Sequence, residues 1–210
     1  MDPPPFFLLW EIIDPSYKVF DNFFELCGYY ADVRLKNTAL ITGASSGIGK
    51  ELARIHAAKG GDLILVARNF DRLQSIKNDL ESKYSIKVKI FRKDLSLSAN
   101  AEALYLEIKR ENLEVEYLIN NAGVGNYGHF IETSLQEELN MIELNISSLV
   151  ILTKLFSQDM VKRGSGSIMN VASLLSFLPF PYYSVYSASK SFVLAFSETV
   201  NAELEGTGVM

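Results

Sequence analysis

Cysteine is almost absent from this 210-residue chain, which contains only Cys27. A single cysteine cannot form an internal disulfide or a thiolate metal cluster, so a reducing compartment is the simplest interpretation. The two histidines, His56 and His129, lie far apart in sequence without flanking ligands and do not form a zinc pattern. We therefore expect no metal site.

The chain also lacks an excess of basic residues and a long apolar run. Its formal net charge is −5 at pH 7, whereas a nucleic-acid-binding protein usually carries a basic face. No uninterrupted apolar run reaches the roughly 18 residues needed to cross a bilayer. A secretory signal has basic residues before its apolar stretch, and here no basic residue precedes the first apolar patch. We expect a cytoplasmic protein without a nucleic-acid partner, attached to a membrane at most by its surface.

Residues 1–35 differ from the rest because they are rich in aromatic residues and contain one glycine. Val19, Phe23 and Leu26 are spaced like the apolar stripe of a helix. Three interpretations stay open: a helix packed on the main domain, a subunit contact, or an amphipathic segment lying on a membrane. The segment is acidic and lacks a Lys/Arg flank, which favours packing or association.

From residue 36 to residue 210, short β-rich runs alternate with helical ones. Near-continuous apolar strands that alternate with helices indicate a parallel sheet covered on both faces, and right-handed crossovers make it a doubly wound α/β fold. We expect one domain with strands at 38–42, 63–68, 86–91, 115–120 and 167–172, and helices at 47–59, 70–83, 97–112, 135–163 and 185–205.

The stretch TGASSGIGK, residues 42–50, lies between the first expected strand and the first expected helix. Its glycine spacing fits neither the P-loop nor the G-x-G-x-x-G fingerprint. Glycines still allow a sharp turn and a close approach to a ligand, and amides at a helix N-terminus favour an anion. We expect a pyrophosphate site, with Lys50 a solvent-exposed helix residue. The expected contacts are Gly43, Ser45, Ser46, Gly47, Ile48 and Gly49.

In a dinucleotide site, the residues at the end of the second strand determine whether a ribose with a free 2′-hydroxyl, as in NAD(H), or with a 2′-phosphate, as in NADP(H), is preferred. There, Ala67 stands where an acid for the ribose 2′-hydroxyl could sit, and Arg68 follows it. An arginine suits a 2′-phosphate through charge-assisted hydrogen bonds, although Arg68 could instead be exposed and pair with Asp71. The missing acid and the present base both favour NADP(H) over NAD(H).

Four motifs in register resemble the short-chain dehydrogenase/reductase family: the glycine loop, NNAG at 120–123, Ser173, and YSASK at 186–190. The resemblance covers residues 36–210 and implies a Rossmann-like fold and an oxidoreductase. It also implies hydride transfer between a nicotinamide cofactor and a carbonyl or alcohol, and a homo-oligomer.

The resemblance further implies a role for each matching residue. Tyr186 matches the general acid/base, and Lys190, one helical turn on, would lower the tyrosine pKa and hold the nicotinamide ribose. Ser173 would hydrogen-bond the substrate oxygen, and Asn145 would position a water for proton relay. The implied cofactor contacts beyond the glycine loop are Arg68, Asp94 near the adenine, Leu95, Asn121, Ala122, Gly123, Tyr186 and Lys190.

The chain contains a second Tyr-x-x-x-Lys pair, Tyr105 and Lys109. Thirteen residues before Tyr105 stands Arg92, whereas Ser173 stands thirteen before Tyr186 and follows an apolar run. We therefore interpret Tyr105 as a structural helix residue. Asn120 is expected to tie the sheet together, and Ser176, Ser184, Ser187 and Ser189 are expected to be structural.

The segment LLSFLPFPYYSV, residues 174–185, must pass beside the reacting carbon. Its Leu, Phe and Tyr residues favour an apolar ketone or aldehyde with a lipid-like, steroid-like or aromatic skeleton over a small sugar. Packing of the same side chains within the loop or at a subunit contact is the alternative. A non-catalytic NADPH-binding scaffold and a membrane-associated lipid reductase are the alternative functions.

The chain stops at GTGVM, residues 206–210, where a sixth strand should begin. The family resemblance implies further elements that would close the sheet and cover the substrate. We therefore expect a fragment of a longer protein with its last strands missing, and the activity of these 210 residues alone is left open.

Overall fold

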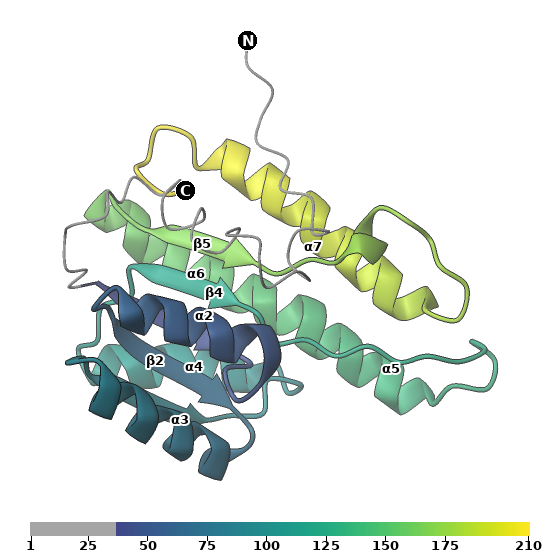
Figure 1. Ribbon diagram of the computed structural model, residues 1–210. Coiled ribbons are helices and arrows are strands. Elements are labelled where there is room, and N and C mark those ends of the chain that lie inside the picture. The colour runs from purple at the N-terminus through teal and green to yellow at the C-terminus, as the bar shows by residue number, and fades with distance from the viewer. Residues whose placement is uncertain (1–36) are drawn as a thin grey trace.

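The computed structural model describes residues 37–210, which form a three-layer α/β structure (Figure 1). The interpretations of residues 1–35 lie outside this described part. The strands are β1 (Thr38–Thr42), β2 (Asp62–Ala67), β3 (Val88–Arg92), β4 (Tyr117–Asn120) and β5 (Ser167–Asn170). The helices are α2 (Gly47–Ala58), α3 (Phe70–Lys83), α4 (Ala99–Arg110), α5 (Leu135–Ile142), the π-helix η2 (Glu143–Ser147), α6 (Ser148–Arg163), the short 3-10 helix η3 (Leu174–Ser176) and α7 (Ser184–Glu203).

All strand pairs of the sheet are parallel, and the strand order is β3-β2-β1-β4-β5. The central strand is β1, where Leu40 pairs with Ile64 of β2 on one side and Leu118 of β4 on the other. After β3 the chain crosses back over the sheet to β4, so the direction of winding reverses between β1 and β4. Such a reversal leaves a crevice at the carboxyl ends of the strands.

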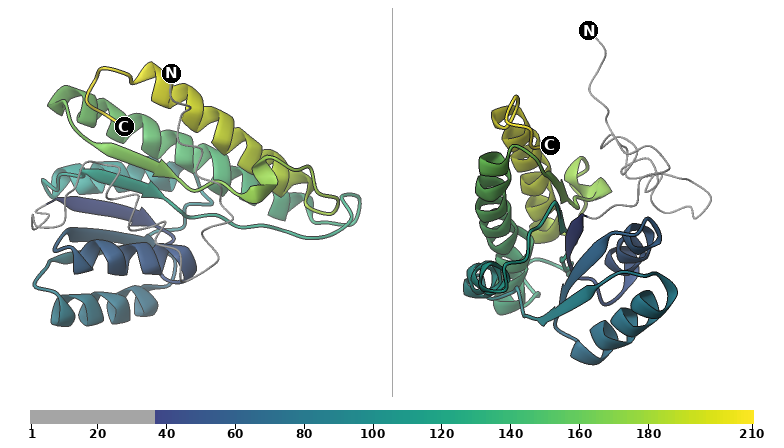
Figure 2. Two further views of the ribbon diagram at one scale, coloured as in Figure 1. Left: turned by 45° about the horizontal axis from the view of Figure 1, so that its top comes forward. Right: turned by 90° about the vertical axis from the view of Figure 1, so that its left-hand side faces the viewer.

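The sheet has a separate apolar core on each face, because successive strand residues point to opposite faces. Ile41 and Leu65 pack under α2 and α3 with Leu52 and Leu73, and the views of Figure 2 show these two helices on the same side of the sheet. The alternate residues Leu40, Ile64 and Leu118 pack under α4 and α6, with Leu104, Leu152 and Phe156. This confirms the expected doubly wound parallel sheet.

The ends of the observed elements differ from the predicted ones by at most two residues, with one exception. The single helix expected at 135–163 is interrupted by the π-helix at 143–147. A π-turn adds one residue to a helical turn and often occurs at a functional site. Within the described residues, Leu135–Arg163 is the one stretch long and apolar enough to cross a membrane, but its Leu152, Phe156 and Met160 belong to the core.

The last residues of the chain lie beside β5. Val209 forms a parallel bridge with Gly166, and the amide of Ile168 donates to the carbonyl of Met210 over 2.7 Å. Residues 209–210 therefore occupy the position expected for the start of a sixth strand.

Candidate active site

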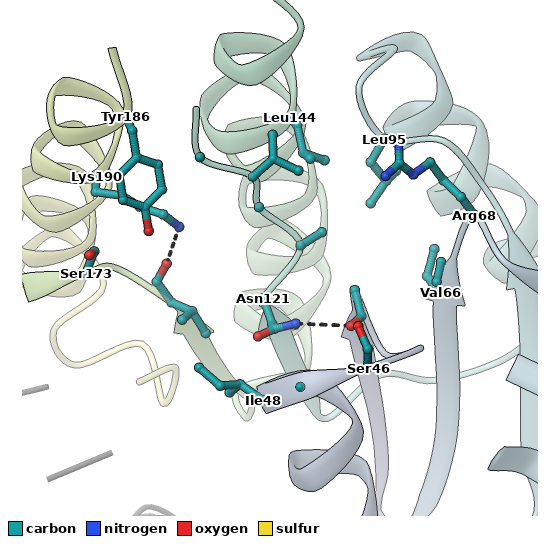
Figure 3. Close-up of a pocket in the computed structure, with 18 of the residues that line it drawn as sticks. Ser46, Ile48, Val66, Arg68, Leu95, Asn121, Leu144, Ser173, Tyr186 and Lys190 are labelled. Carbon is teal, nitrogen blue, oxygen red and sulfur yellow. Dashed lines mark hydrogen bonds between the residues drawn. The ribbon is translucent and has the colours of Figure 1, made fainter. Parts of the chain in front are cut away.

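A cavity of about 560 Å³ opens at the carboxyl ends of the strands, at the reversal between β1 and β4. Figure 3 shows Arg68 and Leu95 toward one end, Ser173, Tyr186 and Lys190 toward the other, and Asn121 between them. Most of the residues expected at the cofactor and the reacting carbon thus share one cavity. The lining residues are Gly43, Ser46, Gly47, Ile48, Val66, Ala67, Arg68, Asp94, Leu95, Asn121, Ala122, Gly123, Val124, Gly125, Leu144, Val171, Ala172, Ser173, Tyr186 and Lys190.

The glycine loop needs glycine at three positions, at two for the backbone conformation and at the third for lack of space. Gly43 and Gly47 have φ of 67° and 53°, in the left-handed region that favours glycine. A Cβ at Gly49 would lie 2.5 Å from Nδ2 of Asn121, whereas a Cβ at Gly47 would meet none of the described residues within 4 Å, apart from its own chain neighbours. Ser46 precedes α2 without a side-chain cap, so the first amides of the helix stay available to a ligand. The loop therefore fits a phosphate group.

Hydrogen bonds join the glycine loop to the end of β4. The hydroxyl oxygen of Thr42 accepts from the amides of Asn121 and Ala122 over 3.0 and 2.9 Å. The side-chain amide of Asn121 donates to the carbonyl of Thr42 over 2.9 Å. The floor of the cavity is thus fixed by side chains at both strand ends, and Asn121 supports the loop as well as lining the cavity.

Arg68 and Asp94 stand at the ends of β2 and β3. Arg68 is exposed at the cavity, directly after Ala67. Burial tends to raise the pKa of Asp94, but hydrogen bonds from Ser96 and the positive charge of Arg68 outweigh it and lower the pKa overall. This end of the cavity therefore presents a carboxylate beside a guanidinium.

Lys190 and Tyr186 lie one turn apart on α7 and both line the cavity. The ammonium of Lys190 donates to the carbonyl of Val171 over 2.7 Å. Burial lowers the pKa of Lys190 to about 8. A Cβ at Gly125 would lie 3.2 Å from the ring of Tyr186, and one at Gly123 would lie 3.3 Å from Nζ of Lys190. Both glycines therefore keep the space beside the two side chains clear.

Ser173 follows β5 and faces the same end of the cavity (Figure 3). Its hydroxyl oxygen accepts from the amide of Leu175 over 3.2 Å. Because a hydroxyl carries one proton and two lone pairs, this bond leaves the proton of Ser173 available to an acceptor in the cavity.

Asn145 is buried on the π-helix and does not line the cavity. Its side-chain amide donates to the carbonyl of Val124 over 2.9 Å and to the hydroxyl of Ser189 over 3.1 Å, and its oxygen accepts from the amide of Val124. Ser189 in turn donates to the carbonyl of Tyr186 over 2.7 Å. Asn145 therefore connects the end of β4 to α7 from behind the cavity.

Ser45 and Gly49 also lie outside the cavity lining, while seven lining residues were not predicted as contacts. These seven contribute backbone or apolar side-chain surface, so no side-chain chemistry marks them in the sequence. Val171 and Ala172 directly follow β5, and this position after a strand is the one signal that could have found them. The seven are Val66, Ala67, Val124, Gly125, Leu144, Val171 and Ala172.

The second Tyr-x-x-x-Lys pair lies on α4, outside the cavity lining. The hydroxyl of Tyr105 and the ammonium of Lys109 both donate to Oδ2 of Asp159, over 3.0 and 2.9 Å. Burial and the neighbouring carboxylate raise the pKa of Tyr105. These contacts tie α4 to α6. Asn120 likewise donates to Thr153 and to Asn170.

The loop that contains Tyr127 and the loop that contains Tyr182 lie beside the cavity and are joined by aromatic side chains. They project side by side from the domain in Figures 1 and 2. The amide of Gly128 donates to the carbonyl of Tyr182 over 3.0 Å, and the ring of Tyr127 lies 5.4 Å from that of Tyr182 and 5.1 Å from that of Tyr183. We call Tyr127, Tyr182 and Tyr183 the aromatic clamp. Its Tyr183 lies 6.0 Å, centroid to centroid, from Tyr186.

Known proteins with a similar sequence or structure belong to one family. The family profile described as short chain dehydrogenase matches residues 37–210. A very-long-chain 3-oxoacyl-CoA reductase of Pyrenophora tritici-repentis is 40% identical over 175 residues, which cover 81% of this chain and 51% of that protein. A 17-beta-hydroxysteroid dehydrogenase type 3 of Mus musculus is 37% identical over 177 residues, which cover 82% of this chain and 56% of that protein.

A solved short-chain dehydrogenase from Sphingobium yanoikuyae in complex with NADPH superposes with a TM-score of 0.78 at 36% identity, covering 82% of this chain and 68% of that one. The chain spans about half the length of the curated relatives it matches. The matched residues include the glycine loop, the end of β4 and all of α7. The chain belongs to the short-chain dehydrogenase family.

Proposed function

We propose that this chain is an oxidoreductase that interconverts a carbonyl and an alcohol with NADP(H), with Tyr186 as the general acid/base. The observation that carries the proposal is the single cavity in which Ser173, Tyr186 and Lys190 stand at one end and the glycine loop and Arg68 at the other. A nicotinamide dinucleotide would supply the hydride when bound.

The cavity residues fit such a dinucleotide. Gly47 leaves open space beside an uncapped helix N-terminus, where a pyrophosphate would be held. Asp94 and Leu95 would contact the adenine, and Arg68 would contact a 2′-phosphate. Preference for NADP(H) over NAD(H) rests on Arg68 and on the uncharged Ala67 before it. The NADPH bound by the Sphingobium yanoikuyae relative agrees with this preference.

The chain's own residues would handle the proton. Tyr186 would donate its hydroxyl proton to the substrate oxygen during reduction, while the proton of Ser173 would hydrogen-bond the same oxygen. The charge of Lys190, held 2.7 Å from the carbonyl of Val171, would stabilise the tyrosinate that remains. Asn145 would support the return of a proton from solvent by holding the backbone of residue 124 and, through Ser189, that of Tyr186.

The substrate we propose is an apolar ketone or aldehyde with a lipid-like, steroid-like or aromatic skeleton. Large apolar side chains are exposed on the two joined loops, among them Phe130, Ile131, Leu178 and Phe180. The segment 174–189 contains no charged residue, so it offers no cationic side chain to an anionic substrate group. The names of the two curated relatives, an acyl-CoA reductase and a hydroxysteroid dehydrogenase, agree with an apolar substrate class.

A non-catalytic NADPH-binding scaffold is the alternative, and a lipid reductase attached to a membrane through residues 1–35 is a variant of the main proposal. A cytoplasmic location and a homo-oligomer stay predictions. The proton-transfer residues favour an enzyme, because a binding module has no need of them.

NADPH oxidation by the full-length protein is to be followed against a panel of apolar and small ketones, beside a Tyr186→Phe variant. We expect turnover by the parent chain and a loss of about 10² to 10⁴-fold in kcat in the variant, with NADPH affinity kept. NADPH binding without turnover on any ketone would support the scaffold instead. Equal turnover in the variant would refute Tyr186 as the acid.

A further inference from the structure

Ser176, the last residue of η3, links two parts of the candidate active site through one hydroxyl. Its oxygen accepts from the backbone amide of Ser173 over 3.2 Å, and its proton is donated to the backbone carbonyl of Lys190 over 2.8 Å. Since a hydroxyl has one proton, donation to Lys190 leaves a lone pair for Ser173. Ser176 therefore satisfies both partners at once, and alanine could satisfy neither.

The same short segment holds Lys190 at two points. The carbonyl of Val171 accepts from the side-chain ammonium over 2.7 Å, and the hydroxyl of Ser176 donates to the main-chain carbonyl. Residues 171–176 thus fix both ends of the lysine. Ser173 lies between these two attachment points, so its place relative to Lys190 is set by them.

The bond from Ser176 also affects how Ser173 presents its hydroxyl. Ser176 holds the main-chain amide of Ser173, while the amide of Leu175 donates to the Ser173 hydroxyl oxygen. These two hydrogen bonds form a capping box at the start of the 3-10 helix, in which Ser173 takes part with both its amide and its hydroxyl oxygen. They leave the hydroxyl proton of Ser173 available to an acceptor in the cavity. Without Ser176, the amide of Ser173 loses its partner and the turn loses one of its two closing bonds.

We propose that Ser176 is a positioning residue, which fixes the Ser173 hydroxyl at its distance from Tyr186 and Lys190. The proposal rests on the proposed function, because it assigns Ser176 to the same reaction. Ser176 does not line the cavity, so it acts through Ser173 and touches no reacting atom.

A double-mutant cycle in NADPH-dependent ketone reduction tests this. We expect Ser176→Ala to lower kcat about tenfold to hundredfold, with KM changed less than about threefold. In a Ser173→Ala background the same substitution should lower kcat less than about twofold, because the group it positions is gone. An equal loss in both backgrounds would overturn the proposal, since a general loss of structure acts the same way in each.

Ser191→Ala is the matched control. Ser191 joins the same turn to the same helix by donating to the carbonyl of Ser176 over 2.8 Å, but it is exposed and forms no hydrogen bond to Ser173. We expect its kcat to stay within about twofold of the parent. A loss as large as that in Ser176→Ala would assign the effect to docking of the turn and overturn the specific role.

Amide exchange separates this proposal from the proposed function, since it needs no turnover. The amide proton of Ser173 should exchange with solvent at least about tenfold faster in Ser176→Ala and at the parent rate in Ser191→Ala. A parent chain without turnover would refute the proposed function and, with it, any role of Ser176 in that reaction. Unchanged exchange in Ser176→Ala would refute the link to Ser173 even if the parent is active.

Discussion

Lys190 is a buried cation whose charge changes near neutral pH. Burial lowers its pKa to about 8, so the amine loses its proton as the pH rises through that value. The proposed mechanism needs the charge, because it stabilises the tyrosinate of Tyr186. We expect kcat/KM for NADPH, which reports on the free enzyme, to fall about tenfold per pH unit above pH 8. The measurement is this ratio between pH 6 and pH 10.

Two lysine variants check the origin of that pH dependence. Lys190→Met should lower kcat/KM about 10²-fold or more at pH 7 and should remove the decrease above pH 8. Lys50→Met, at an exposed lysine beside the glycine loop, should keep the parent profile. Persistence of the decrease in Lys190→Met would mean that another group titrates there.

Arg68 is the residue on which the proposed preference for NADP(H) depends. Its guanidinium lies at the cavity and is close enough to Asp94 to lower the pKa of that carboxyl. We expect Arg68→Ala to raise KM for NADPH about tenfold and to leave KM for NADH within about twofold, because NADH has no 2′-phosphate. Steady-state kinetics with both cofactors measure this.

Arg72→Ala is the control for Arg68, since Arg72 is an exposed arginine on the first turn of α3 and does not line the cavity. It should leave both KM values unchanged. Equal increases for NADPH and NADH in Arg68→Ala would show that the guanidinium serves the cavity in another way.

Single residues differ in how well the sequence predicts them. Ser173, Tyr186 and Lys190 carry reactive groups at a recognisable spacing, and the structure brings them to one cavity. Gly125 and Val171 escape prediction, because one contributes a missing Cβ and the other a backbone carbonyl. The sequence does not show that Gly125 lies against Tyr186, and a residue of any type has the backbone carbonyl that Val171 contributes.

The aromatic clamp joins two loops that the sequence shows only as apolar segments. Its Tyr182 has a φ of 70°, which is unfavourable for a bulky residue and costs on the order of 1 kcal/mol. The bond from Gly128 and the contacts with Tyr127 offset this cost. The clamp therefore connects the two loops beside Tyr186.

Tyr127→Ala should loosen the clamp and so weaken selection of bulky apolar ketones. We expect kcat/KM to fall about tenfold for a bulky apolar ketone and less than about threefold for a small one, because ring contacts of this kind contribute about 1 kcal/mol. Comparison of the two substrates measures the ratio. Phe192→Ala is the control, as Phe192 is exposed on α7 and stacks on Phe196. A fall of equal size for both ketones would count against a role in selection.

Periodicity predicts the helices and strands of residues 37–210 well, because apolar runs and glycine turns mark them. It does not predict the π-helix at 143–147. No proline or glycine interrupts the sequence there, so the extra residue of the turn leaves no local signal. The position of Asn145 behind the cavity follows from that turn.

The stability of the whole domain should depend on His56, which is fully buried, bonds to the carbonyl of Asn37 over 3.0 Å, and lies edge to face with Tyr117. Burial lowers its pKa to about 4 from 6.5. The unfolded chain takes up the proton more readily than the folded one. The contribution of neutral His56 to the free energy of unfolding is therefore fully present above pH 6.5 and is lost as the pH falls toward 4. We expect the free energy of unfolding to drop about 2 kcal/mol between pH 7 and pH 5 from this group.

Denaturant unfolding at several pH values measures this change. His56→Gln should remove the His56 part of the slope whatever it does to stability at pH 7. His129→Gln, at an exposed loop histidine, should keep the parent slope. An unaltered slope in His56→Gln would show that other groups cause the acid sensitivity.

The strand order separates the two ends of the cavity onto different parts of the molecule. Arg68 and Asp94 follow β2 and β3, whereas Ser173 and Lys190 come from the segments after β5. Under the proposed function, substitutions in the turn after β2 would therefore change the cofactor preference and leave the residues proposed for proton transfer unchanged.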